Sequence, residues 1–249
     1  MKYWARLITA ALATLVVLGA AFELGKFSAD NLSGLQGPQR VRVEDLGQLQ
    51  KYRTANSQLV ADPSRVVFLG DSITYLWKLD KSFPARSYVN RGIGGQTSAD
   101  MLVRFREDVV DLKPKTVVIL AGINDFFWRT EGSDDDEQTL KNLQTNDQSM
   151  AELAELHHIR PVLASILPVH SYGFLAKISY AKIPKGVIVR ANEWLKGFCT
   201  QHGYQYIDYY SAMVDDHGML RKELSDDGVH PNEAGYSTMT RVFSNSFRE

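Results

Sequence analysis

Short apolar runs alternate with longer amphipathic stretches from residue 66 onward, and this alternation restricts the possible folds more than any other feature. The runs are Val66–Leu69, Tyr88–Val89, Thr116–Ala121, Pro161–Leu167 and Tyr204–Ile207. Helical patterns follow over 98–111, 137–158, 187–202 and 232–247, and a leading helix is predicted over 43–59. Strands that alternate with helices predict an α/β fold, with one parallel sheet covered on both faces.

The first residues differ from the rest of the chain. Lys2 and Arg6 precede the apolar stretch Leu7–Phe22, and positive residues before a short apolar segment are typical of an export signal. Gly19 and Ala21 fit the small residues of a cleavage site, but the stretch is also long enough for an uncleaved single-pass membrane anchor. Both interpretations predict an exported protein, periplasmic or extracellular, which an anchor would hold at the cytoplasmic membrane. A buried N-terminal helix is the third alternative.

We therefore predict three parts: a signal peptide or anchor over 1–26, a polar linker and leading helix over 27–60, and one domain over 61–249. A net charge of −1 gives no basic surface for nucleic acid, so no nucleic-acid partner is predicted. Cys199 is the single cysteine, which excludes an internal disulfide framework and a cysteine-built zinc site. Its apolar neighbours predict a buried thiol. The sequence leaves the oligomeric state open.

Polar loops follow the predicted strands, at the edge where open parallel sheets bind ligands. They are Gly70-Asp71-Ser72, Asn90–Ser98, Ala121–Asp125 and, after one further segment, Ser225–Tyr236. If the four loops converge, they bring together a serine, glycines, an amide, a carboxylate and an imidazole. These groups suit acyl transfer.

Each group answers a need of that chemistry. The Ser72 hydroxyl is a weak nucleophile and needs a base, for which His230 is the candidate. Asp227 lies three residues before His230 and can hold the imidazole in one tautomer. An oxyanion needs donors that are fixed in advance, and the side chain of Asn124 and the backbone N–H groups of Gly95 and Ser72 are the candidates.

Taken singly, each of these residues has a more ordinary interpretation. Ser72 alone would be a helix N-cap, Asn124 a turn residue, His230 a surface or core histidine, and Asp227 a cap. Their joint occurrence in four loops favours the catalytic interpretation. The chain has no G-x-S-x-G motif, so the nucleophile elbow of the α/β-hydrolases is absent from the sequence.

With these four blocks the chain resembles the SGNH, or GDSL-type, esterases and lipases. The blocks are Gly70-Asp71-Ser72, Asn90-Arg91-Gly92-Ile93-Gly94-Gly95, Gly122-Ile123-Asn124-Asp125 and Asp227-Gly228-Val229-His230-Pro231. The resemblance implies a flavodoxin-like three-layer α/β/α sandwich with a parallel five-stranded sheet. It also implies ester hydrolysis through an acyl-serine, with neither metal nor cofactor.

By the same resemblance, Ser72 is the nucleophile and Asp227 and His230 complete the triad. Ser72, Gly95 and Asn124 form the oxyanion hole, with Gly95 selected by its offset from the start of its block. The sequence departs from the family pattern at Ile73, where the family has leucine. This volume-conserving change should not affect the chemistry.

Several functions remain open on these residues. The first is an exported hydrolase of acyl esters, short-chain or acetyl, on a small molecule, glycan or lipid. An acyltransferase onto envelope glycans would use the same residues, and a non-catalytic binding domain could share the fold. A phosphate- or metal-dependent enzyme would use Asp71, Asp125 and Asp227, although hydrogen bonding within the loops is the expected role of Asp71 and Asp125.

Three further segments can be interpreted either as functional or as purely structural. The acidic run at 133–137 is expected to be a solvated loop and helix N-terminus rather than a calcium site. Residues 168–186, including His170, form a long connection that is either a lid or binding loop or packing over the sheet edge. Phe126–Arg129 could help such a loop to shape an acyl or aromatic pocket.

Overall fold

The structure is a computed structural model and describes residues 47–128, 133–170, 183 and 185–248. It divides into two compact units, Met1–Arg42 and Val43–Glu249, and the described residues all belong to the second. The predicted export segment Leu7–Phe22 and most of 168–186 lie outside the described residues. No helix within the described ranges is long and apolar enough to cross a membrane.

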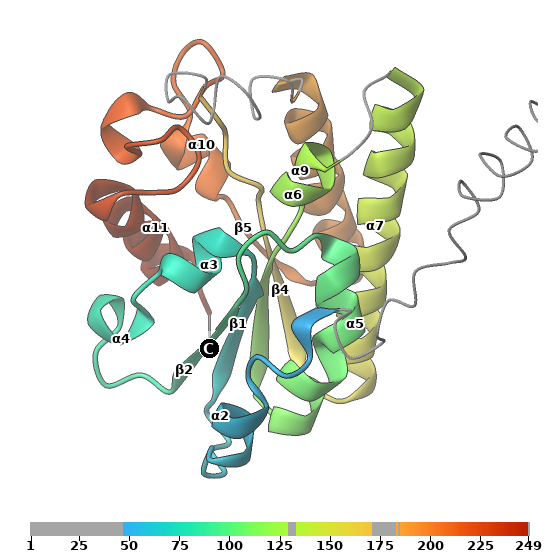
Figure 1. Ribbon diagram of the computed structural model, residues 1–249, viewed down its shortest axis with the longest axis vertical. Helices are drawn as coiled ribbons and strands as arrows, with labels where there is room; N and C mark the ends of the chain where they lie inside the picture. The colour runs from blue at the N-terminus through green and yellow to red at the C-terminus, as the bar shows by residue number, and fades with distance from the viewer. Residues whose placement is uncertain (1–46, 129–132, 171–182, 184, 249) are drawn as a thin grey trace, which may run out of the picture. The chain divides into compact units, whose positions relative to one another are not determined.

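The second unit is built on one five-stranded sheet in the order β2-β1-β3-β4-β5, and every paired strand is parallel (Figure 1). The strands are β1 Val66–Gly70, β2 Tyr88–Gly92, β3 Thr116–Leu120, β4 Arg160–Ala164 and β5 Gln205–Ile207. The helices are α2 Arg53–Ser57, α3 Ser72–Leu76, α4 Leu79–Ser82, α5 Ser98–Asp108, α6 Ile123–Phe127, α7 Ser133–Leu156, α9 Lys185–His202, α10 Tyr209–Met213 and α11 Glu233–Ser246, with 3-10 turns at Val110–Leu112 and Lys222–Leu224. This strand order is the flavodoxin-like arrangement, so the predicted fold class is confirmed.

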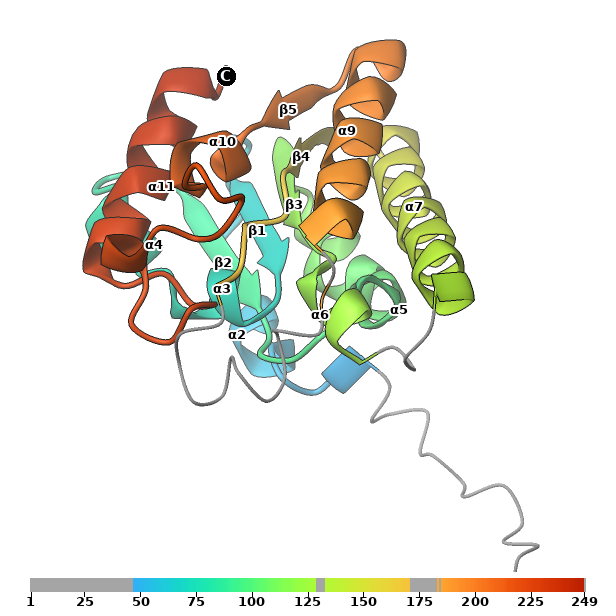
Figure 2. The same cartoon turned by 90° about the horizontal axis from the view of Figure 1, so that it is seen from above.

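Helices cover both faces of the sheet. Figure 2 shows α5, α7 and α9 on one side, and α4, α10 and α11 on the other. The side chains of β1 alternate between the two layers, because successive residues of a strand point to opposite faces. Val67 and Leu69 pack with α5, while Phe68 packs with an aromatic group that includes Trp77 and Phe243.

That aromatic group fixes the last helix against the first strand. The Phe68 and Phe243 rings lie 5.1 Å apart, and the Trp77 and Tyr236 rings stack 6.0 Å apart. The Tyr236 hydroxyl also donates to the carbonyl of Ile73 at 2.8 Å. As a result, α11 is bound to α3, the short helix that begins at Ser72.

The prediction of a helix over 43–59 is wrong for most of its described part. Gly47 and Gln48 have φ values of 69° and 52°, in the left-handed region, which a right-handed helix cannot contain. The chain turns there, and α2 comprises only Arg53–Ser57. The other predicted elements form with ends shifted by a few residues. For example, β2 continues to Gly92, and α7 begins at Ser133, so the acidic run lies at a helix N-terminus as expected.

Candidate active site

Ser72 stands at the carboxyl edge of the sheet, as the first residue of α3 and two residues after the end of β1. The side chain of the preceding residue, Asp71, caps this helix by accepting the backbone N–H of Ile73 at 2.8 Å. Because Asp71 supplies the cap, the Ser72 hydroxyl remains available for another partner.

That partner is His230. The Ser72 Oγ lies 2.9 Å from His230 Nε2, and the other ring nitrogen, Nδ1, lies 2.6 Å from Asp227 Oδ2. The structure therefore brings together, in one hydrogen-bonded line, three side chains that the sequence singled out. This geometry allows the imidazole to accept a proton from Ser72 while Asp227 holds Nδ1–H.

The carboxylate and the imidazole share one tight turn. Asp227 Oδ1 accepts the backbone N–H groups of Val229 and His230 at 2.9 and 2.8 Å. Gly228 between them has a φ of 87°, a conformation that glycine adopts without strain. Its N–H donates to Ser225 Oγ at 2.9 Å. The turn itself thus fixes the orientation of Asp227 toward His230.

The two carboxyl groups near Ser72 have different pKa values. Partial burial alone would raise the pKa of Asp227, but hydrogen bonds from the His230 side chain and backbone and from Val229 hold that pKa below its usual value. Asp71 is fully buried, and burial raises its pKa to about 7 despite the Ile73 N–H. Asp227 is therefore the carboxylate that stays ionised to face an imidazolium.

The two other predicted oxyanion donors lie in neighbouring loops. Gly95 is exposed with a φ of 78°, and no atom of the described residues lies within 4 Å of the place where its Cβ would stand. Asn124 is buried, and its Nδ2 donates one hydrogen bond to the carbonyl of Gln96 at 3.0 Å. An amide nitrogen carries two hydrogens, so Asn124 retains a second N–H for a ligand.

A glycine before Asn124 allows this placement. Gly122 has a φ of 123°, and a Cβ there would lie 2.5 Å from Ile166 Cδ1. Any other residue would be strained and would collide with the core. The sequence therefore needs glycine at this point to turn β3 into α6.

Sequence reasoning missed the buried polar group that holds these loops. The Arg104 guanidinium, fully buried in α5, donates to the Gly70 carbonyl at 3.0 Å and to Gln96 Oε1 at 2.6 Å, and it pairs with Asp108 at 2.9 Å. Gln96 Nε2 in turn donates to the Gly47 carbonyl. An arginine in an amphipathic helix is normally expected on the solvated face. The sequence therefore carries no signal that Arg104 is buried and holds these loops.

Asp125 ties the third block to α5. Its carboxylate accepts the backbone N–H of Ser98 at 2.9 Å and the Ser98 hydroxyl at 2.5 Å. The side chain of Asn146 on α7 donates to the same hydroxyl. Burial raises the pKa of Asp125 in spite of these bonds, and burial together with the nearby Asp125 raises the pKa of Asp147.

The three aspartates proposed for a metal-dependent enzyme have separate hydrogen-bond partners. Asp71 bonds Ile73, Asp125 bonds Ser98, and Asp227 bonds His230. Within the described part of the chain, no three His, Cys, Asp or Glu side chains are arranged to hold a metal ion. The expected loop-holding role of Asp71 and Asp125 agrees with these contacts.

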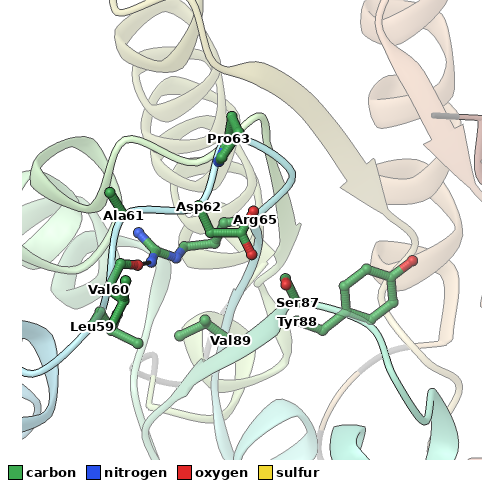
Figure 3. Close-up of a pocket in the computed structure, with 9 residues that line it drawn as sticks. All are labelled: Leu59, Val60, Ala61, Asp62, Pro63, Arg65, Ser87, Tyr88 and Val89. Atoms are coloured by element: carbon green, nitrogen blue, oxygen red, sulfur yellow. Dashed lines mark hydrogen bonds between the residues drawn. The ribbon is translucent and has the colours of Figure 1, made fainter.

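A pocket of about 380 Å³ lies at the opposite edge of the sheet, around the starts of β1 and β2 (Figure 3). It is lined by Leu59, Val60, Ala61, Asp62, Pro63, Arg65, Ser87, Tyr88 and Val89. Its Arg65 guanidinium donates to the carbonyls of Leu112 and Val60, and its Asp62 accepts from Ser64. The lining contains no histidine to activate a serine, so the four-loop edge remains the candidate site.

The start of the long connection lies against this site. The backbone N–H of His170 donates to the Gly228 carbonyl at 2.8 Å, which brings residue 170 to the turn that carries Asp227 and His230. Residues 171–182, 184 and Arg129 lie outside the described residues. A lid over 168–186 therefore stays a prediction.

The family to which the chain is similar is the one that the four sequence blocks indicate. Residues 68–237 match the GDSL-like lipase/acylhydrolase family, over more than half of the chain. The chain belongs to this family. The solved structure of a GDSL-like lipase from Bacteroides thetaiotaomicron is 33% identical, with 81% of this chain and 97% of that chain covered and a TM-score of 0.70.

Two curated relatives are similar over part of their length. An uncharacterised lipoprotein from Bacillus subtilis is 37% identical over 81 residues, which cover 32% of this chain and 32% of the relative. An acetylxylan esterase from Xylanibacter ruminicola is 25% identical, with 81% of this chain and 46% of the relative covered. The chain thus spans less than half the length of either curated relative.

Proposed function

We propose that this family member is a serine esterase that cleaves short-chain or acetyl esters through an acyl-serine intermediate. The observation that carries the proposal is the line of Ser72, His230 and Asp227, with contacts of 2.9 and 2.6 Å. The acetylxylan esterase among the relatives favours acetyl esters of sugars as the substrate. The steps proposed below use only side chains and backbone N–H groups of this chain.

In the first half of the reaction, Ser72 Oγ attacks the ester carbonyl as His230 Nε2 takes the hydroxyl proton. The negative charge that forms on the carbonyl oxygen is bound by the N–H groups of Ser72, Gly95 and Asn124. Asp227 stabilises the imidazolium that forms. The C–O bond then breaks, and the alcohol leaves with the proton from His230.

The second half repeats these steps with water. His230 removes a proton from a water molecule as the water oxygen attacks the acyl-serine, and the same donors bind the second oxyanion. Ser72 recovers its proton from His230, and the carboxylic acid leaves. A sugar hydroxyl in place of water would give acyl transfer, so product analysis with and without a sugar acceptor distinguishes the two reactions.

The test is labelling and turnover in Ser72→Ala. We expect wild-type protein to react with a fluorophosphonate probe and to hydrolyse p-nitrophenyl acetate, and the variant to lose both. Ser57→Ala removes an exposed hydroxyl on α2 that donates to the nearby Thr54 carbonyl, and it serves as the matched control. Wild-type turnover that persisted in Ser72→Ala would rule out this mechanism.

We also propose export. The support is the order of Lys2, Arg6 and the apolar stretch Leu7–Phe22, together with a lipoprotein among the relatives. Cell fractionation of the full chain, followed by N-terminal sequencing, tests this proposal and distinguishes a cleaved signal from an anchor. Recovery of the uncleaved chain in the cytoplasm would contradict it.

A further inference from the structure

An exposed aromatic ring lies beside the oxyanion hole. Trp128 caps α6, the helix that begins next to Asn124, and 64% of its surface is exposed. Its Nε1–H donates to the carbonyl of Gly95 at 3.2 Å, so the indole is tied to the residue whose N–H would bind the oxyanion. An exposed aromatic residue alone needs no explanation, but this contact places Trp128 next to the reacting atoms.

The orientation of the ring is fixed on two sides. One edge carries the bond to Gly95, and the Phe127 ring meets it edge to face at a centroid distance of 4.5 Å. Most of the Trp128 side chain stays open to solvent, and no atom of the described residues lies within 4 Å of the place where a Cβ on Gly95 would stand. The one polar group of the indole is taken by the Gly95 carbonyl, so the exposed ring is a flat apolar surface in contact with water. Such a surface suits a ligand that has one apolar face and polar edges that stay in water.

A pyranose sugar is such a ligand. Its C–H groups form an apolar face that stacks on an aromatic ring, while its hydroxyls remain in water. A long acyl chain would instead need an enclosed apolar channel, because one open ring leaves most of the chain's surface in water. The observations therefore favour a sugar over a fatty acyl group at this position.

From this arrangement we infer that Trp128 forms the sugar-binding subsite of the enzyme and selects esters whose alcohol is a pyranose. The inference rests on the proposed esterase function, because it concerns the alcohol part of the ester that this enzyme would cleave. Trp128 acts here as a specificity residue, and Gly95, Asn124 and Ser72 keep their roles at the carbonyl.

The test is the ratio of kcat/KM for acetylated xylobiose to kcat/KM for ethyl acetate, which has no ring to stack. We expect Trp128→Ala to lower this ratio roughly two- to tenfold, the loss of one aromatic contact. Trp128→Phe keeps a ring without the N–H, so it should retain most of the ratio even if both esters react more slowly. Leu156→Ala, which removes an exposed apolar side chain from the end of α7, should not change the ratio.

A second measurement needs no turnover. In Ser72→Ala protein, we expect acetylated xylobiose to change the tryptophan fluorescence, and the additional Trp128→Phe change to remove that response. An unchanged ratio in Trp128→Ala, or a fluorescence response that survives Trp128→Phe, would overturn the inference. If the wild-type protein cleaves neither ester, the proposed esterase function fails, and the binding titration still decides whether Trp128 holds the sugar.

Discussion

Asp71, the residue next to the proposed nucleophile Ser72, is the least expected residue of the candidate site. Asp71 is buried, accepts one backbone N–H and has its pKa raised to about 7, chiefly by burial. Asp227, which bonds the His230 imidazole, has its pKa held below the usual value by hydrogen bonds from His230 and Val229, although partial burial alone would raise it. Between about pH 4 and about pH 7, Asp227 is therefore ionised while Asp71 keeps its proton. The two differ because several hydrogen-bond donors stabilise the charged form of Asp227, whereas Asp71 is buried with one donor.

This difference predicts how stability depends on pH. The folded protein keeps the Asp71 proton up to about pH 7, whereas the unfolded chain loses it near pH 4. The unfolded state binds fewer protons between these values, so the contribution of Asp71 lowers the free energy of unfolding as pH rises from about 4 to 7, with no further change above. We expect Asp71→Asn to remove this contribution while its side-chain oxygen still caps α3.

Urea unfolding of both proteins from pH 4 to pH 8 checks this prediction. The free energy of unfolding of Asp71→Asn, minus that of the wild type, should increase by about a few kcal/mol as the pH rises from about 4 to about 7. Asp80→Asn, which changes an exposed carboxylate in α4, controls for the loss of one charge. Parallel curves for wild type and Asp71→Asn would show that Asp71 is ionised in the folded protein.

At this scale, the sequence predicted that the side chains of Ser72, His230 and Asp227 would meet, but it did not predict the roles of Gln96 and Arg104. Ser72, His230 and Asp227 were identified because serine chemistry needs a base and an orienting acceptor, and the loops of a parallel sheet meet at one edge. Gln96 and Arg104 were missed because their role depends on burial, which one sequence does not reveal. Trp128 was noticed only as part of an aromatic cluster, and its bond to Gly95 appears only in the folded chain.

At the scale of elements, α5 connects the loop that carries Ser72 to the loop Asn90–Ser98. Its residue Arg104 bonds the Gly70 carbonyl and the Gln96 side chain, and its first turn is held through Ser98 by Asp125 of the third block. One helix thus contacts three of the four loops. The sequence predicted this helix from its apolar spacing, but the same pattern does not indicate what its polar residues hold.

We expect Arg104→Met to lower the free energy of unfolding by about 3–5 kcal/mol, because it leaves the buried Asp108 carboxylate without its cationic partner. Arg106→Met on the same helix removes an exposed guanidinium that lies 3.8 Å from Asp111, and it should cost at most about 1 kcal/mol. Urea unfolding of both variants measures the difference. Similar losses would mean that the burial of Arg104 has no energetic consequence.

At the scale of the whole molecule, the segment before the first strand belongs to the packed unit. The Gly47 carbonyl accepts from Gln96, the Tyr52 hydroxyl donates to the Gly92 carbonyl, and Asn56 bonds both Asp108 and Arg91. The sequence predicted a regular helix here and a domain that starts at residue 61. Local periodicity could not reveal a segment that is held by side chains from distant parts of the chain.

A pair of truncations tests the extent of this unit. The reference is a chain that begins at Val43, the first residue of the second unit. A chain that begins at Gln58 should be several kcal/mol less stable, because each buried polar group left without a partner costs about 1–3 kcal/mol. Thermal unfolding followed by circular dichroism gives both values. Equal stabilities would place the start of the independent domain after residue 57, near the predicted boundary.

The separation of the proposed catalytic residues along the chain has a consequence during protein synthesis. Ser72 lies 158 positions before His230, whereas Asp227 lies only three positions before it. At ordinary translation rates, the ribosome makes the hydroxyl roughly 8 to 30 seconds before the imidazole. We expect Ser72 to be unreactive in the nascent chain throughout this interval, because His230 is not yet present to accept its proton. The nascent chain would therefore not cleave esters near the ribosome. On the proposed function, reactivity begins only after the Asp227–His230 turn has been made and has folded back onto the first strand.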